Sequence, residues 1–134
     1  MSDIKEVLAA NTAFYAAFDV GDLSAMDRLW SRTTKVACTH PGWTALSQRS
    51  QIMESWQAIL AERPGPGVSC YDARAHVAAG WAFVTCNESV GNNLLAATNV
   101  FVHEAEGWRM VHHHASPVAR AFVKGAPNKS DRIH

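Results

Sequence analysis

The chain has 134 residues, 48% of them hydrophobic, and its 12 basic and 12 acidic residues cancel. This length suits one domain with its own core, and the hydrophobic fraction argues against disorder. The balanced charge, without a run of Lys or Arg between aromatics, disfavours a nucleic-acid surface. No apolar stretch is long enough for a membrane span, and the N-terminus lacks a basic flank and an apolar signal core. We therefore expect a cytoplasmic protein that contacts neither nucleic acid nor membrane.

The beginning of the chain has the periodicity of helices. Apolar and aromatic residues spaced by three or four from Ile4 to Phe18 predict a first helix, with Ser2 as its N-cap. Gly21 stops this helix, and Asp22 starts a second one whose apolar residues share one face.

A short strand and a third helix are expected next. Residues 34–40 read as a strand that is broken by the Pro-Gly pair at 41–42. Ser47 is placed to cap a helix whose pattern over residues 52–60 is the clearest 3.6-residue period of the chain. The Pro- and Gly-rich segment 63–67 is a loop.

After residue 67 the period changes from 3.6 residues to 2. Four consecutive strands are predicted, at residues 68–77, 81–90, 94–103 and 108–116. Short turn segments separate them, so the strands form hairpins and the sheet is mostly antiparallel. Three amphipathic helices cover one face of such a sheet. Because both parities of the strands carry apolar residues, we expect the other face to form a homodimer with a second copy.

The domain is placed at residues 1–118, followed by a C-terminal tail at 119–134. The three cysteines, at positions 38, 70 and 86, form no Cys-x-x-Cys pair, and each lies in a predicted strand. Buried, reduced thiols are therefore expected rather than disulfides or metal ligands.

The order of these elements resembles the SnoaL-like branch of the nuclear transport factor 2-like superfamily. The resemblance is carried by the Gly-Asp turn at 21–26, the histidine-proline turn at 39–43, the helix pattern at 52–56 and the last strand at 107–117. The last stretch is also similar to the association domain of calcium/calmodulin-dependent protein kinase II. The resemblance implies an α+β, cystatin-like cone, with three N-terminal helices packed on a curved, mostly antiparallel sheet and a pocket for a small molecule.

The resemblance does not choose a reaction, because the superfamily includes isomerases, dehydratases, cyclases, transport factors and oligomerisation hubs. The kinase-hub relatives carry pocket arginines at places that correspond here to Cys86 and Ala115. A pocket that binds a carboxylate is therefore not implied, and Cys86 is instead assigned to the lining of a substrate pocket.

Three residues are candidates for catalysis. His40, after the first strand, suits a general base near neutral pH, and the alternative is a turn histidine bonded to backbone. By analogy with the hub relatives, His113 faces the cavity along with Val111 and Ala115, and His112 and His114 face the dimer side, unless a single bulge inverts this assignment. The hydroxyl of Tyr15 either donates a hydrogen bond to a substrate carbonyl or enolate, or is satisfied locally in the core.

Further residues are candidates for substrate binding. Trp43 and Trp56 are aromatics suited to enclose an apolar ligand, with plain core packing as the alternative. Glu88, on the same strand parity as Cys86, is either a buried carboxyl suited to acid–base chemistry or a strand-edge residue in water. Asn99 either orients a ligand carbonyl or bonds across to Asn87.

His112 and His114 share one face of their strand, which suits zinc only if a further ligand joins them. No carboxylate or cysteine motif accompanies them, so neither a metal nor another cofactor is expected. The first prediction for function is a pocket protein acting as a cofactor-free isomerase, dehydratase or cyclase on an apolar carbonyl compound. The alternative is a non-catalytic association or ligand-binding module, and whether the chain is an enzyme stays open at this point.

Overall fold

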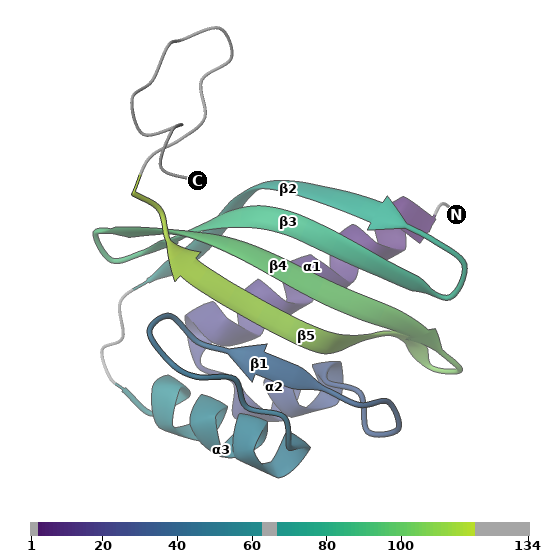
Figure 1. Ribbon diagram of the computed structural model, residues 1–134, viewed down its shortest axis with the longest axis horizontal. Helices are drawn as coiled ribbons and strands as arrows, with labels where there is room; N and C mark the ends of the chain where they lie inside the picture. Colours follow the sequence, from purple (N-terminus) through teal and green to yellow (C-terminus); the bar gives the residue numbers. More distant parts are fainter. Residues whose placement is uncertain (1–2, 63–66, 120–134) are drawn as a thin grey trace, which may run out of the picture.

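The computed structural model describes residues 3–62 and 67–119 and shows helices packed on a curved sheet (Figure 1). The helices are α1 (Asp3–Val20), α2 (Leu23–Leu29) and α3 (Arg49–Leu60), and the strands are β1 (Ala37–Thr39), β2 (Val68–Val77), β3 (Trp81–Val90), β4 (Asn93–Glu104) and β5 (Gly107–Pro117). The predicted α+β order and the four long strands are confirmed. The predicted cap Ser2, most of the predicted loop and nearly all of the predicted tail lie outside the described residues. In the described part, no helix is long and apolar enough to cross a membrane.

The sheet has five strands in the order β1-β5-β4-β3-β2. The four long strands pair antiparallel with their neighbours, whereas β1 pairs parallel with β5. In Figure 1, α1 runs along one face of the sheet, and α2 and α3 lie at the β1 end. The helices thus cover a single face, which we call the inner face. Within residues 3–62 and 67–119, no other layer covers the opposite face, which we call the outer face.

Alternation along the strands decides which side chains enter the core. In β3, Ala82, Val84 and Cys86 are buried, while Trp81 and Thr85, which have the opposite parity, are exposed. The same alternation in β4 buries every second residue from 95 to 101. The core beneath the helices is therefore built from one parity of each long strand.

In α1, the buried stripe is shifted slightly from the predicted one. Val7, Asn11, Phe14 and Tyr15 are buried as the spacing predicts, but Ile4 is exposed. The first turn of α1 therefore lies outside the core, and the buried stripe starts at Val7.

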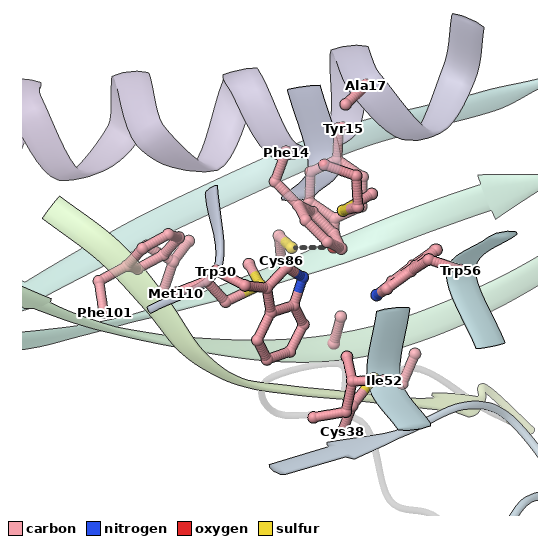
Figure 2. Close-up of a cluster of buried hydrophobic side chains, with 14 of the residues drawn as sticks. Phe14, Tyr15, Ala17, Trp30, Cys38, Ile52, Trp56, Cys86, Phe101 and Met110 are labelled. Atoms are coloured by element: carbon pink, nitrogen blue, oxygen red, sulfur yellow. Dashed lines mark hydrogen bonds between the residues drawn. The ribbon is translucent and has the colours of Figure 1, made fainter. Parts of the chain in front are cut away.

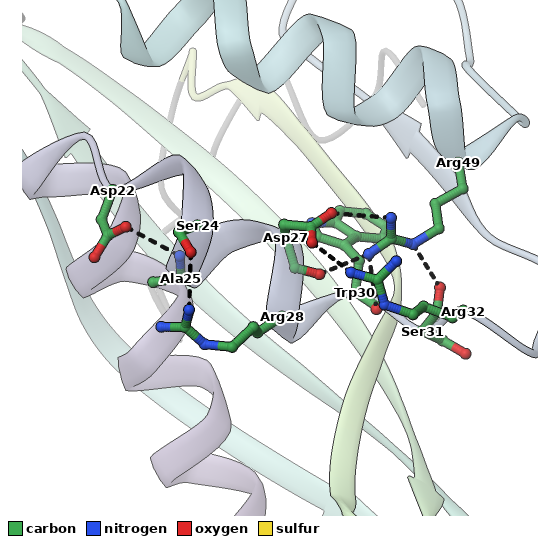
Figure 3. A network of polar contacts seen from close by, with 9 residues as sticks. All are labelled: Asp22, Ser24, Ala25, Asp27, Arg28, Trp30, Ser31, Arg32 and Arg49. Atoms are coloured by element: carbon green, nitrogen blue, oxygen red, sulfur yellow. Dashed lines mark hydrogen bonds and ion pairs between the residues drawn. The ribbon is translucent and has the colours of Figure 1, made fainter.

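The connection between α2 and α3 rests on polar contacts (Figure 3). Asp22 caps α2 by accepting a hydrogen bond from the backbone N–H of Ala25, as predicted. Ser47 was expected to cap the next helix, and this is wrong: Gln48 occupies the N-cap position without a side-chain bond. The side chain of Arg49 does not cap the helix, but it donates to the carboxylate and backbone carbonyl of Asp27 and so ties the start of α3 to α2.

The first strand is shorter than the predicted 34–40, since only Ala37–Thr39 pair with β5. The hydroxyls of Thr33 and Thr34 instead donate to the Glu104 carboxylate at the end of β4. These bonds hold residues 33–34 in a turn and keep them out of the sheet.

Candidate functional site

A group of buried polar side chains converges beneath the helices, from one helix and three strands. Tyr15 comes from α1, Glu88 from β3, Asn99 from β4 and His113 from β5, and each is 4% exposed or less. Register brings them together: Asn99 lies opposite both Val84 of β3 and His113 of β5. We call these four residues the polar cluster.

Hydrogen bonds in the polar cluster have a consistent direction. The amide nitrogen of Asn99 donates to the Asn11 carbonyl at 2.8 Å and to the Tyr15 hydroxyl at 3.2 Å. The Tyr15 hydroxyl donates to the Glu88 carboxylate at 2.5 Å. Because Asn99 spends its N–H groups this way, its Oδ1, 2.6 Å from Nδ1 of His113, acts as the acceptor. His113 therefore carries its proton on Nδ1, and its Nε2 lone pair lies 3.9 Å from Oε2 of Glu88.

Burial shifts the proton affinities in the polar cluster. It raises the pKa of Glu88, and the hydrogen bond from Tyr15 opposes that shift. It also raises the pKa of Tyr15, assisted by the negative charge of Glu88. Burial lowers the pKa of His113 to about 3, so this imidazole is neutral at physiological pH. The cluster thus combines a carboxyl that holds its proton more tightly with a neutral imidazole and a protonated phenol.

His40 lies beside the cluster rather than in it. Its ring centroid is 6.4 Å from that of His113, and its Nε2 lies 2.8 Å from the hydroxyl of Ser55. Ser55 donates to the backbone carbonyl of Ile52, so the hydroxyl accepts from Nε2 of His40 and leaves Nδ1 as the unprotonated nitrogen. Burial lowers the pKa of His40 to about 4.

The two nominated tryptophans occupy different environments. Trp56 is fully buried and packs edge-on against Phe14 and His40, with ring centroids 5.5 Å and 4.9 Å away. Figure 2 shows Trp56 and Phe14 among the core side chains. Trp43 is 48% exposed and contacts His40 from the other side, at 4.9 Å. His40 therefore lies between a core aromatic and a surface aromatic.

Three buried indole N–H groups in the described part of the chain have no hydrogen-bond partner, those of Trp30, Trp56 and Trp108. Buried donors are rarely left unpaired, because each lost hydrogen bond costs roughly 1–3 kcal/mol. Trp56 is the one in ring contact with both His40 and His113. An acceptor supplied from outside the protein would satisfy it there.

A groove between α1 and β2, with a volume of about 370 Å³, reaches the polar cluster from the surface. Tyr15 and Asn11 line it, together with Cys70 of β2. The groove therefore connects solvent with the hydrogen-bonded partners of Glu88 and Asn99.

On the outer face, His112 and His114 line a separate hollow of about 570 Å³, with their rings 6.1 Å apart. In the described part of the chain, no three His, Cys, Asp or Glu side chains are grouped as metal ligands. His113 points inward between these two, so the three histidines divide between the faces.

A bulge in β5 accounts for the register of this strand. Val100 pairs with His112 and Phe101 with Met110, so Val111 is the extra residue. Val111 was expected beside His113 on the inner face; Met110 is the fully buried residue instead.

Two partners in the site were not nominated from the sequence. Asn11 stands in the apolar stripe of α1, where a polar residue needs a buried partner, and that position was its available signal. Ser55 gave no such signal, because a helical serine most often faces water. Five of the eight nominated residues therefore lie together, the four of the polar cluster and Cys86, whose sulfur is 3.3 Å from the Tyr15 hydroxyl. The other three, His40, Trp43 and Trp56, form an adjoining group.

Comparison with known proteins agrees with this architecture. The SnoaL-like domain family matches residues 7–120. A proposed dehydratase from the NTF2-like family of Streptomyces avermitilis is 34% identical, with a TM-score of 0.78, covering 88% of this chain and 97% of that one. A proposed calcium/calmodulin-dependent protein kinase type II association domain from Thiobacillus denitrificans is 32% identical, with a TM-score of 0.74 and coverage of 83% and 94%. F-box protein SKIP8 of Arabidopsis thaliana is 29% identical over 114 residues, 84% of this chain and 49% of that protein.

Fold and comparisons together define a cystatin-like cone of the nuclear transport factor 2-like class, as the sequence predicted. Within that class, the chain belongs to the SnoaL-like domain family. It spans about half the length of the curated plant relative that it matches.

Proposed function

We propose that this protein is an enzyme that moves a proton on a small carbonyl compound, in an isomerisation, dehydration or cyclisation. The observation that carries the proposal is the buried 2.5 Å hydrogen bond between the Tyr15 hydroxyl and the Glu88 carboxylate. Burial raises the pKa of this carboxyl group, so its carboxylate is a stronger proton acceptor than that of an exposed glutamate. A phenol beside it supplies a hydrogen bond to the oxyanion that forms when a carbonyl compound loses an α-proton.

The roles follow from the hydrogen-bond directions. Glu88 takes the α-proton, and the enolate oxygen accepts the hydrogen bond that Tyr15 otherwise gives to Glu88. Asn99 holds the Tyr15 oxygen and fixes the tautomer of His113. The Nε2 lone pair of His113 lies 3.9 Å from the Glu88 carboxylate, and because burial lowers the pKa of His113 to about 3, the abstracted proton stays on Glu88. The proton then returns to a different carbon, or to a departing hydroxyl group in a dehydration.

The group around His40 favours an apolar substrate. Trp56 offers an N–H without a partner, and His40 and Trp43 add aromatic surface next to it. A substrate that lies along these rings would place a polar oxygen on the indole nitrogen and keep its hydrocarbon part dry. With Nδ1 unprotonated, His40 is the second candidate for the base.

Proton abstraction can be measured before the natural substrate is known. In D₂O, an enzyme of this class exchanges the α-hydrogens of a ketone for deuterium, which NMR follows for a panel of cyclic and aryl ketones of increasing size. The wild-type protein is expected to accelerate exchange for the better-fitting ketones. Glu88→Gln should lower this rate by about 10²–10⁴-fold and Tyr15→Phe by about 10²-fold, because they remove the base and the oxyanion donor.

Asn87→Ala is the matched control, because Asn87 neighbours Glu88 in β3 and lies on the outer face. It should leave exchange unchanged. Exchange that survives in Glu88→Gln but is lost in His40→Ala would transfer the base to His40. A folded wild-type protein that exchanges none of the ketones, or exchange untouched by every one of Glu88→Gln, His40→Ala and His113→Ala, would refute the proposal.

A non-catalytic association module is the second candidate, favoured by the outer face. Phe83 stacks between the rings of Trp81 and His76, with centroids 6.1 Å and 4.6 Å away, and Trp81 is 46% exposed. Apolar rings in a row on an uncovered sheet face suit a protein interface. We propose that this face pairs with the same face of a second copy. This interface is compatible with catalysis, since the polar cluster lies on the opposite face of the sheet.

The cytoplasmic location stays a prediction from the sequence.

A further inference from the structure

A pair of thiols lies beside the polar cluster, where the edge strand β2 meets α1. Cys70 of β2 is in register with Glu88 of β3, and Cys86 precedes Glu88 by two residues on the same face. The two cysteines are therefore diagonal neighbours on adjacent strands, with their side chains on the same face of the sheet. Both are free thiols.

The surroundings of the two thiols are shared. The amide nitrogen of Asn11 lies 3.7 Å from the sulfur of Cys70, and the amide nitrogen of Asn99 lies 3.9 Å from the sulfur of Cys86. These two asparagines are joined by a hydrogen bond of 2.8 Å. Three strands and one helix thus surround the two sulfurs with polar side chains.

The two thiols differ in exposure. Cys70 is half-buried and lines the groove between α1 and β2, whereas Cys86 is buried behind it. A small molecule that enters the groove therefore meets one thiol with a second directly behind it. The third thiol, Cys38, is buried on β1 beside His40, and burial raises its pKa to about 12.

Ionisation differs within the pair in a way that favours reaction. The contact with Cys70 lowers the pKa of Cys86, whereas burial and the negative charge of Glu88 oppose this shift. The same contact raises the pKa of Cys70, so the proton stays on the outer sulfur. The thiolate is the nucleophile of thiol chemistry, and here its position is the inner sulfur.

We propose that Cys70 and Cys86 form a peroxide-sensitive thiol pair that closes to a disulfide between β2 and β3. One thiolate attacks hydrogen peroxide, forms an S–O bond and expels hydroxide, which leaves a sulfenic acid. The hydroxide takes up the proton that the thiol released on ionising and becomes water. The second sulfur attacks the sulfenic sulfur, forms the S–S bond and expels hydroxide, which leaves as water with the proton of the attacking thiol. Two thiols lose two electrons and two protons in total, and one peroxide becomes two waters.

The position of the pair gives the reaction a consequence for the site. Cys86 is 3.3 Å from the hydroxyl of Tyr15, and Cys70 lines the groove that reaches Tyr15. A disulfide removes both S–H groups and ties the groove wall to the strand that carries Glu88. The inference reaches beyond the proposed proton transfer, because the thiol chemistry needs no substrate.

The experiment uses the full chain, fully reduced and then treated with hydrogen peroxide at one equivalent. Intact mass should fall by about 2 Da, the loss of two hydrogens, with a proteolytic peptide that joins residues 70 and 86. Thiol titration after denaturation should fall from three thiols to one. Cys38→Ser should behave like the wild type, whereas Cys70→Ser and Cys86→Ser should gain oxygen at the remaining thiol instead of losing two hydrogens. Three surviving thiols, or a disulfide that includes Cys38, would overturn the proposal.

A second probe tests proximity without requiring disulfide geometry. Phenylarsine oxide bridges two neighbouring thiols through its arsenic atom and releases water. Wild type and Cys38→Ser should each bind one equivalent tightly enough to survive dilution, and Cys70→Ser should bind none. Equal binding by Cys70→Ser would show that the two sulfurs are not a pair. Both assays are independent of the deuterium-exchange assay, so failure here is distinguishable from failure of the proposed catalysis.

Discussion

The two faces of the same sheet use polar and aromatic residues in opposite ways. On the inner face, Glu88, Asn99 and His113 are buried, and each has a named partner within the fold. On the outer face, aromatic rings stand partly in water and touch mainly each other. A polar group that is costly to bury and a ring that is costly to expose both indicate a use beyond folding. The comparison separates a chemical site from an interaction surface that lies only one sheet thickness away.

The largest effect on stability is expected from breaking the inner face at Asn99. Asn99→Ala removes the hydrogen-bond partner of three buried groups, namely the Nδ1–H of His113, the Asn11 carbonyl and the Tyr15 oxygen. Roughly 3–4 kcal/mol should be lost from the free energy of unfolding in urea, more than the loss of one hydrogen bond.

Thr98→Ala is the control for this variant, because Thr98 is the preceding residue of β4 and lines the outer hollow. Its change should stay within about 0.5 kcal/mol. Equal losses in the two variants would mean that the inner network contributes no more to the fold than the outer polar residues do.

A pH effect of intermediate size is expected from His40. Its pKa is about 4 in the folded protein, below the ordinary histidine value of 6.5 that applies to the unfolded chain, so folding favours the neutral form. The stability from this group is present above pH 6.5 and is lost as the pH falls toward 4. Between pH 7 and pH 5 the loss should reach roughly 2 kcal/mol.

The measurement is the difference in unfolding free energy between pH 7 and pH 5, for wild type and for His40→Gln. The raised pKa of Glu88 acts in the opposite direction, but it is common to both proteins and cancels in the comparison. Ile52→Val, a buried change with no titrating group, should keep the wild-type dependence. A His40→Gln protein with that same dependence would contradict the assigned shift.

The sequence was sufficient for the strands because their signals are local. Alternation and turn residues lie within a few positions of one another, and the observed ends of β2 and β3 are those predicted. Parity also grouped Glu88 with Cys86, with a strand-edge residue in water as the alternative, and the mid-strand position of Asn99 indicated a polar residue that needs a partner. The short β1 was misjudged, because Glu104 of β4 determines where residues 33–34 go.

Convergence of the site could not be predicted in the same way. The bonds of Tyr15 to Glu88 and of Asn99 to Asn11 join residues 73 and 88 positions apart, and no local pattern encodes such a pairing. The bulge at Val111 shifts the register of β5 by one residue just before His113. Resemblance to the hub relatives, and not periodicity, led to the expectation that His113 faces inward.

The smallest effect on the fold, but a clear one on association, is expected from Trp81→Ser. Since Trp81 is already 46% exposed, its loss should change the unfolding free energy of a monomer by no more than about 0.5 kcal/mol. If the outer face forms the dimer, the dissociation constant measured by sedimentation should rise at least about tenfold, which is about 1.4 kcal/mol. Trp43→Ser is the matched control, because Trp43 is 48% exposed but lies beside His40 and away from the outer face. Association that both variants weaken equally would place the interface elsewhere. A wild-type protein that stays monomeric at high concentration would contradict the proposed dimer through the outer face.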